Sequence, residues 1–311
     1  MGRDTGVEGG VGRTALMVAA ARAIETQRPD ALATDVYAAH LVRAASTSAD
    51  WPLRIEDVPD GEANPLWGRL ARYFGLRTRV FDDYLLAAAH AGSWQIVLLG
   101  AGLDSRAFRL DWPPGCVVFE IDQPDVLAFK RSVFDAMGAK PQATRRPIAA
   151  DLRQDWAPAL LEAGFDTNAP TAWLAEGVLL YLSTAAEYLL IDTVDRLSVA
   201  GSALAYEIKL GPESAVVQQG PIYRSAKQQI DVDMIALFDH APRPDSAADL
   251  VNGGWSATTR TAFDFAREHS TRMHGCGLEP MPDDALTANR WVFAAKAGDR
   301  SANGGTHRLL P

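Results

Sequence analysis

Residues 94–109 read WQIVLLGAGLDSRAFR and decide the fold of this 311-residue chain. The run from Trp94 to Leu99 is short, apolar and followed by Gly100, which is typical of a strand buried in a parallel sheet. Gly100 and Gly102 lie where the chain must turn from this strand into a helix, and glycine lets the backbone approach a ligand closely there. We therefore predict a strand, a ligand-binding turn and a helix at this point.

Short apolar segments alternate with helical patterns along the rest of the chain. Because a strand, a helix and a following parallel strand connect in a right-handed sense, this alternation predicts a doubly wound α/β sheet. The further strands are predicted at residues 116–122, 145–151, 171–177, 201–209, 255–263 and 290–296. Ligands of such sheets bind at the carboxyl ends of the strands, so the residues that end each strand are the first candidates for a site.

The sequence pattern also divides the chain into a core that holds the predicted sheet and segments that lie outside the sheet. The predicted parts are a flexible tail at 1–12, a helical N-terminal cap at 13–92, a core at 93–297 with a helical lid insertion at 211–252, and a flexible tail at 298–311. The cap is rich in helix formers, with a break predicted at Gly75 and a stop at Gly92. The insertion is assigned to a lid because long insertions in compact domains are usually functional.

The composition limits the kind of protein that this chain can be. Lys and Arg total 30 against 39 Asp and Glu, a net charge of −9, whereas proteins that bind nucleic acid carry basic surfaces. No apolar stretch is long enough to span a membrane, and the N-terminus lacks the apolar core of a secretory signal. The two cysteines are too few for a disulfide framework or an all-cysteine zinc site. We therefore expect a cytoplasmic protein that acts on small molecules, without a metal, membrane or nucleic-acid partner.

Two acidic residues follow predicted strands at positions that suit a nucleoside. Asp122 ends the second strand, 20 residues after Gly102, and a carboxylate there can accept hydrogen bonds from both hydroxyls of a ribose. Asp151 follows the third strand, where its carboxylate can accept from an adenine amino group while the N–H of Leu152 donates to the ring. The alternatives are a solvated loop carboxylate at Asp122 and a helix N-cap at Asp151.

A third acidic residue, Glu176, ends an apolar strand together with Gly177. A buried carboxylate is costly unless it is partnered, so Glu176 indicates a cleft at the strand end rather than an idle core position. A dinucleotide site is the competing interpretation of the whole pattern, and it would make the protein a nicotinamide-dependent oxidoreductase. Ser105 stands where the dinucleotide fingerprint has its third glycine, which counts against that alternative.

Four motifs, taken together with the start of the chain, resemble a known family. They are GAGLDSRAFRL at 100–110, FEIDQPD at 119–125, ADLR at 150–153 and WLAEGVLLYL at 173–182, preceded by VGRTALMVAAARAIETQRPDALATDVYAAHLV at 11–42. In this order and spacing they resemble the leucine carboxyl methyltransferase-like family. The resemblance is greatest to its bacterial branch of S-adenosylmethionine-dependent methyltransferases and polyketide carboxyl O-methyltransferases, and it extends over nearly the whole chain.

This resemblance implies a fold and a cofactor. The fold is the Rossmann-like class I methyltransferase sheet of about seven strands, the last one antiparallel, and the cofactor is S-adenosyl-L-methionine. The residues implied for cofactor binding are Arg79, Gly100, Gly102, Asp122, Asp151, Leu152 and Glu176. Gly100 and Glu176 would contact the amino-acid end of the cofactor, and Arg79 would pair with its carboxylate. Arg22 is a candidate for a second basic residue there.

The predicted activity is methyl transfer to an oxygen of a small-molecule acceptor, an enzyme of the EC 2.1.1 class. A carboxylate is already ionised near neutral pH, whereas a phenol, with a pKa of about 10, would benefit from a general base. No histidine lies in a recognisable motif, which favours a carboxylate acceptor. The resemblance to the bacterial branch implies that this acceptor is an acid of secondary metabolism, such as a polyketide. Tyr181, Tyr206 and Tyr223 are candidates for positioning the acceptor. A phenolic acceptor and a binding module without catalysis are the alternatives.

Overall fold

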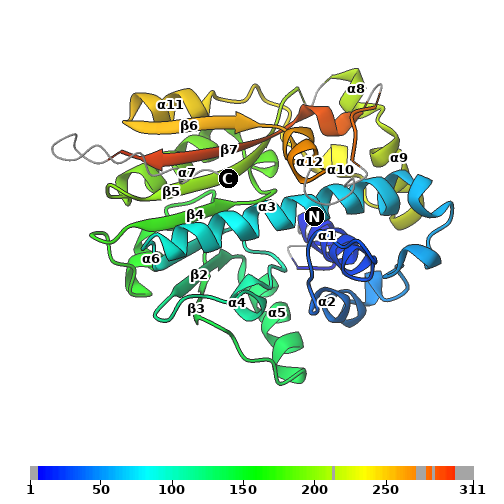
Figure 1. The fold of residues 1–311 in the computed structure, drawn as a ribbon, viewed down its shortest axis with the longest axis horizontal. Coiled ribbons are helices and arrows are strands. Elements are labelled where there is room, and N and C mark those ends of the chain that lie inside the picture. The colour runs from blue at the N-terminus through cyan, green and yellow to red at the C-terminus, as the bar shows by residue number, and fades with distance from the viewer. Residues whose placement is uncertain (1–5, 212–213, 271–277, 282–283, 298–311) are drawn as a thin grey trace.

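The fold is described from a computed structural model of the chain (Figure 1). The structure describes residues 6–211, 214–270, 278–281 and 284–297. Within them, the predicted doubly wound sheet is confirmed, with seven strands in the order β3-β2-β1-β4-β5-β7-β6. The strands are β1 (Gln95–Leu99), β2 (Val117–Asp122), β3 (Thr144–Ala149), β4 (Thr171–Ala175), β5 (Ala203–Lys209), β6 (Trp255–Arg260) and β7 (Asn289–Lys296).

β1 lies in the parallel part of the sheet, between β2 and β4. Gln95 of β1 pairs in register with Val117 of β2 on one side and with Thr171 of β4 on the other. The strand order therefore reverses at β1, and such a reversal opens the crevice in which ligands of this kind of sheet bind. β7 is antiparallel to both β5 and β6, as the family resemblance implies.

The residues of β1 alternate between two apolar layers, one on each face of the sheet. Ile96 and Leu98 join the layer that contains α3, whereas Val97 and Leu99 join the layer formed with α6 and α7. All four side chains are buried, which is why the strand reads as a continuous apolar run. The helices of the core are α4 (Arg106–Arg109), α5 (Pro124–Ala136), α6 (Ala157–Glu162), α7 (Thr184–Arg196) and α12 (Ala262–Ser270).

The segment predicted as a helical cap packs against the sheet through α3, which crosses in front of it in Figure 1. Its helices are α1 (Gly10–Thr26), α2 (Ala38–Ala44) and α3 (Ala71–His90). Short helical turns join them and also occur later in the chain: η1 (Ser46–Ser48), η2 (Ile55–Asp57), η3 (Gly61–Ala63), the π-helical η4 (Pro65–Leu70), η5 (Leu179–Tyr181) and η6 (Ala285–Ala288). α1 begins at Gly10, within the segment predicted as a flexible tail at 1–12. Residues 1–5 and 298–311, which include most of the two predicted tails, lie outside the described residues.

The break predicted at Gly75 is wrong, because α3 runs through this residue without interruption. Glycine is needed there for a different reason. A Cβ at residue 75 would lie 2.5 Å from Cγ of Glu25 on α1, so the missing side chain lets the two helices pack closely. The stop at Gly92 is confirmed: α3 ends at His90, and Gly92 has a φ of 107°, in the region that favours glycine.

The described residues of the segment predicted as a lid insertion hold four short helices. They are α8 (Ala215–Gln218), α9 (Pro221–Ile230), α10 (Met234–Leu237) and α11 (Ser246–Asn252). The end of α9 is tied to α1, because Arg13 donates to the carbonyl of Ile230 at 2.6 Å. α11 lies on the other face of the sheet, where Leu250 joins the layer of α7. Only the earlier part of the insertion therefore borders the N-terminal helices. None of the described helices is both long and apolar enough to cross a membrane.

Candidate active site

A cavity of about 790 Å³ runs along the carboxyl ends of the parallel strands, within the range of about 300–1,000 Å³ that is typical of small-molecule sites. Parts of α1, α3, α9 and α10 cover it. Its lining follows the order of the sheet, from β3 through β2, β1 and β4 to β5. Six of the residues predicted to bind the cofactor line this cavity: Gly100, Gly102, Asp122, Asp151, Leu152 and Glu176.

The turn after β1 is held by the carboxylate at the end of β2. The N–H of Gly102 donates to Oδ2 of Asp122 at 2.5 Å, and the N–H of Gln123 donates to Oδ1 at 2.7 Å. Gly100 has a φ of 71°, and a Cβ there would lie 2.7 Å from Cγ2 of Val178, so this turn requires glycine. Burial raises the pKa of Asp122 despite these two bonds. Each oxygen keeps lone pairs for a further donor from the cavity.

The loop after β3 presents a carboxylate and a backbone donor side by side. Asp151 accepts from Arg153 at 2.6 Å, and this hydrogen bond is the main reason why the pKa of Asp151 is lowered. The helix that follows begins only at Ala157, so Asp151 does not act as its N-cap. The N–H of Leu152 has no acceptor among the described residues, and Leu152 lines the cavity.

Glu176, which follows β4, is clamped between two arginines. Its Oε1 lies 2.8 Å from Nε of Arg77 and its Oε2 lies 2.6 Å from Nη1 of Arg106. Burial alone would raise the pKa of Glu176, but the charges of Arg106 and Arg77 outweigh burial and lower it. Glu176 is therefore ionised at neutral pH, which agrees with its interpretation as a partnered cleft residue.

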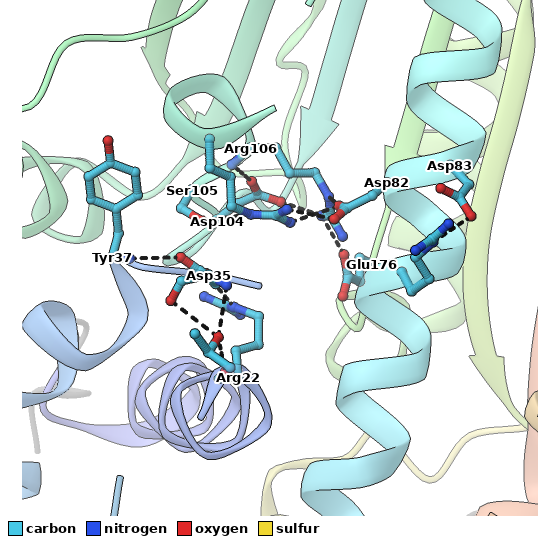
Figure 2. A network of polar contacts seen from close by, with 12 residues as sticks. Arg22, Asp35, Tyr37, Asp82, Asp83, Asp104, Ser105, Arg106 and Glu176 are labelled. Carbon is cyan, nitrogen blue, oxygen red and sulfur yellow. Dashed lines mark hydrogen bonds and ion pairs between the residues drawn. The ribbon is translucent and has the colours of Figure 1, made fainter. Parts of the chain in front are cut away.

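A network of buried charges surrounds Glu176, and Figure 2 shows Arg106 between Asp82, Asp104 and Glu176. Arg106 donates to Asp82 of α3 at 2.6 Å, and Arg109 of α4 donates to the same carboxylate at 2.6 Å. Against the effect of burial, the nearby charge of Arg106 lowers the pKa of Asp104 to about 2. The groups connected by these ion pairs are three arginines and four carboxylates: Arg77, Arg106, Arg109, Asp82, Asp104, Glu176 and Glu207. Together they carry one negative charge in excess.

Arg79 does not lie at the cavity. Its side chain is 44% exposed and pairs with Asp83 at 2.8 Å on the outer face of α3. Two residues along a helix correspond to a rotation of about 200°, so Arg77 faces the sheet while Arg79 faces away from it. The predicted role of Arg79 in binding the cofactor is therefore not supported by its position, and Arg77 is the arginine of α3 that lines the cavity.

Arg22, the second basic candidate, does line the cavity. Its Nε donates to Asp35 at 2.8 Å and its Nη2 donates to the carbonyl of Leu103, in the turn after β1, at 2.8 Å. Its Nη1 has no partner among the described residues, which leaves one charged donor for a ligand.

The three tyrosines separate into two groups. Tyr181 and Tyr223 line the cavity, and the hydroxyl of Tyr181 donates to Oγ1 of Thr14 at 3.2 Å. Tyr206 points to the opposite face of the sheet, where its hydroxyl lies 3.1 Å from Oγ of Ser246. Its candidacy as an acceptor-positioning residue is therefore not supported, because alternate residues of a strand face opposite sides.

Seven charged residues of the cavity lining were not singled out from the sequence: Arg77, Asp104, Arg106, Arg109, Arg153, Glu207 and Lys209. The alternation of β5 was a usable signal for two of them, because Glu207 and Lys209 share the face opposite to Tyr206. His40, His90 and His240 do not line the cavity, which agrees with the absence of any motif around them.

The strand order, the antiparallel β7 and a cavity over the strand reversal are those of the Rossmann-like class I methyltransferase fold. Comparison with known proteins gives the family. The model of the leucine carboxyl methyltransferase family matches residues 15–195. A Streptomyces coelicolor protein named "Putative S-adenosyl-L-methionine-dependent methyltransferase" is 60% identical over 296 residues, which cover 95% of this chain and 96% of that protein. A protein of the same name from Saccharopolyspora erythraea is 45% identical over 257 residues, covering 83% and 87%.

The chain belongs to the leucine carboxyl methyltransferase family, and it is an S-adenosyl-L-methionine-dependent methyltransferase. In structure it is similar to a DUF574 family protein from Streptomyces avermitilis, with a TM-score of 0.51 and 15% identity, covering 83% of this chain and 96% of that one. That likeness concerns the fold. Membership of this family also sets aside the nicotinamide-dependent alternative.

Proposed function

We propose that this enzyme transfers a methyl group to a carboxylate oxygen of a small-molecule acceptor, such as a secondary metabolite or polyketide acid, in the cytoplasm. The supporting observation is that the cavity has two unlike parts. The part at the ends of β1, β2, β3 and β4 carries charged side chains, among them Asp104, Asp122, Asp151 and Glu176. The part beyond β4 is mainly apolar and aromatic; its lining includes Tyr181, Ile222, Tyr223, Met234 and Phe238. The first part suits a charged nucleoside and the second suits the body of an organic acid.

The residues of the polar part match the chemical groups of S-adenosyl-L-methionine. Asp122 offers its remaining lone pairs to the ribose hydroxyls, and Asp151 with the N–H of Leu152 offers an acceptor and a donor to adenine. Glu176 and the excess negative charge of its network favour a ligand that carries a sulfonium and an ammonium group. Arg22 offers Nη1 to the carboxylate at the same end.

When bound, S-adenosyl-L-methionine supplies a methyl group on a positively charged sulfur, which an ionised carboxylate accepts without giving up a proton. The residues of the chain then have to hold the acceptor in reach and exclude water. Tyr181 and Tyr223 suit this task. Burial raises the pKa of both phenols, that of Tyr181 to about 12, so both keep their protons at neutral pH. Tyr223 can donate its proton to the acceptor, whereas Tyr181 already donates to Thr14 and offers its oxygen as an acceptor.

Replacing Arg22 by lysine is expected to weaken binding of S-adenosyl-L-methionine at least tenfold. Lysine keeps a positive charge beside Asp35 but loses the free Nη1, and a hydrogen bond between charged groups contributes about 1.5–3 kcal/mol. Isothermal titration calorimetry measures the change. Arg79→Met is the matched control, since Arg79 lies outside the cavity, and its Kd should stay within twofold of the wild type. If Arg79→Met loses affinity for S-adenosyl-L-methionine and Arg22→Lys does not, then Arg79 rather than Arg22 binds the carboxylate of the cofactor.

The proposed reaction is tested with S-adenosyl-L-methionine labelled in its methyl group and a panel of carboxylic acids and phenols. Labelled product is expected from carboxylic acids, and mild alkali should release the label as methanol because the product is an ester. Label that resists alkali and arises from phenols alone would contradict a carboxylate acceptor and support the phenolic alternative. Cofactor binding without transfer to any member of the panel would contradict a small-molecule acceptor of either class.

A further inference from the structure

The lysine that ends β5 is buried inside the apolar part of the cavity. Lys209 lines the cavity and is only 5% exposed. Its Nζ lies 5.6 Å from the centre of the Tyr223 ring. A cation is therefore present where the proposed function has the acceptor bind.

The described partners of this ammonium are neutral. Nζ of Lys209 donates to the carbonyl of Ala285 at 3.0 Å and to Oδ1 of Asn289 at 2.6 Å. An ammonium has three N–H donors, so one is left for a further partner. Among the described residues Lys209 forms no ion pair.

The two carboxylates whose charges act on Lys209 are bound to other cations. Glu207, two residues earlier on the same strand face, accepts from Arg77 at 2.5 Å. Asp284 forms an ion pair with Arg69. Burial lowers the pKa of Lys209 to about 8, although these two carboxylates act to raise it. The side chain is thus mainly protonated at neutral pH.

Lys209 differs from the other cations of the cavity, because those cations form ion pairs. Each arginine in the lining has a carboxylate partner, as Arg22 has in Asp35 and Arg106 has in Glu176. Even the fully buried Lys130, outside the cavity, pairs with Glu120 at 2.9 Å. A buried charge is costly unless it is paired, and the cavity is the side from which an anion can reach Lys209.

We propose that Lys209 binds the carboxylate of the acceptor, so that the acceptor is an amphipathic acid whose apolar body packs against Tyr223 and Met234. This inference rests on the proposed function and specifies its substrate class. One carboxylate oxygen accepts the third N–H of Lys209, and the other stays available for methylation. The ester that results carries no charge and leaves Lys209 unpaired again, so the acid binds more tightly than the ester and the product is released readily.

A direct test follows the side-chain nitrogen of Lys209 by NMR in protein labelled with ¹⁵N-lysine. The chain has five lysines, so the Lys209 signal is identified by its loss in Lys209→Met. The probes are octanoate, benzoate and 4-phenylbutyrate, each paired with its methyl ester, added to enzyme saturated with S-adenosylhomocysteine. At least one acid is expected to raise the pKa of Lys209 by about one unit or more, as an opposite charge in contact does, and its ester is not.

Variants give an independent measurement. Lys209→Met is expected to raise the KM of the best acid at least tenfold, while the calorimetric Kd of S-adenosylhomocysteine stays within twofold. The matched control is Lys227→Met, which removes an exposed lysine paired with Asp233; it should change neither quantity. Thermal unfolding of both variants reports whether they are folded.

The proposal is overturned if acids are methylated but none of the three probes shifts the Lys209 signal and Lys209→Met leaves the KM unchanged. It is also overturned if Lys209→Met lowers kcat alone and removes a limb of the pH profile near pH 8, which would identify Lys209 as a general base. These results differ from failure of the proposed function, which would appear as alkali-stable product or no transfer while the shift of Lys209 by an acid persists.

Discussion

Binding of S-adenosyl-L-methionine is expected to fall by roughly 100-fold or more when Asp122 is replaced by alanine. The carboxylate holds the turn after β1 through the N–H of Gly102, and we propose that it also accepts two hydrogen bonds from the ribose. Bonds to a charged acceptor contribute about 1.5–3 kcal/mol each, so losing two of them accounts for this factor. Calorimetry with S-adenosyl-L-methionine and with S-adenosylhomocysteine should give the same loss, because both carry the ribose.

Asp111→Ala is the control for this experiment. Asp111 is an exposed aspartate shortly before β2 that does not line the cavity, and its replacement should leave the Kd within twofold of the wild type. Circular dichroism and thermal unfolding report whether Asp122→Ala is folded. An unchanged Kd in a folded Asp122→Ala variant would show that the ribose is bound elsewhere.

The second large effect concerns stability. Replacing Arg106 by methionine is expected to lower the free energy of unfolding by about 3–5 kcal/mol, the range measured when one partner of a buried ion pair is removed. The side chain of Arg106 is 3% exposed and pairs with Asp82, Asp104 and Glu176, which would be left as buried carboxylates facing one another. Urea unfolding at pH 7 measures this change.

Two further variants make the stability experiment decisive. Arg131→Met, on the exposed side of α5, should change the free energy of unfolding by less than about 0.5 kcal/mol. In the double variant Arg106→Met/Glu176→Gln, part of the stability should return, because one of the three carboxylates that had faced Arg106 no longer carries a charge. If Arg106→Met costs less than about 1 kcal/mol, the network does not stabilise the fold through its charges.

The part of the site that lies at strand ends could be predicted from the sequence. Gly100, Asp122 and Glu176 are far apart in the chain, yet each lies at the end of an apolar run that predicts a strand, and Leu152 follows a more polar strand segment, RRPIAAD. Parallel strands bring their carboxyl ends to one edge of a sheet, so four local patterns together define one cavity. No comparable rule predicts which residues of a helix face the cavity, because that depends on how the helix packs against the sheet.

Arg77 and Arg79 illustrate this limit. Both lie in the stretch RTRVFDDYL with polar and apolar neighbours on either side, and the phase of α3 against the sheet decides which of them is buried. That phase depends on contacts with residues as distant as Glu207, which pairs with Arg77. Gly75 is a similar case, because the glycine that suggests a helix break serves the close approach of Glu25 from another helix.

The antiparallel direction of β7 has a practical consequence for the experiments above. Lys209 pairs with Asn289, and Ala203 pairs with Ala295, so β7 enters the sheet beside the cavity and leaves it at the far edge. Gly9 and Gly10, in contrast, lie in the cavity wall. A fluorescent label attached at Lys296 would therefore lie away from the ligands, whereas one attached at Gly9 would adjoin them and report their binding.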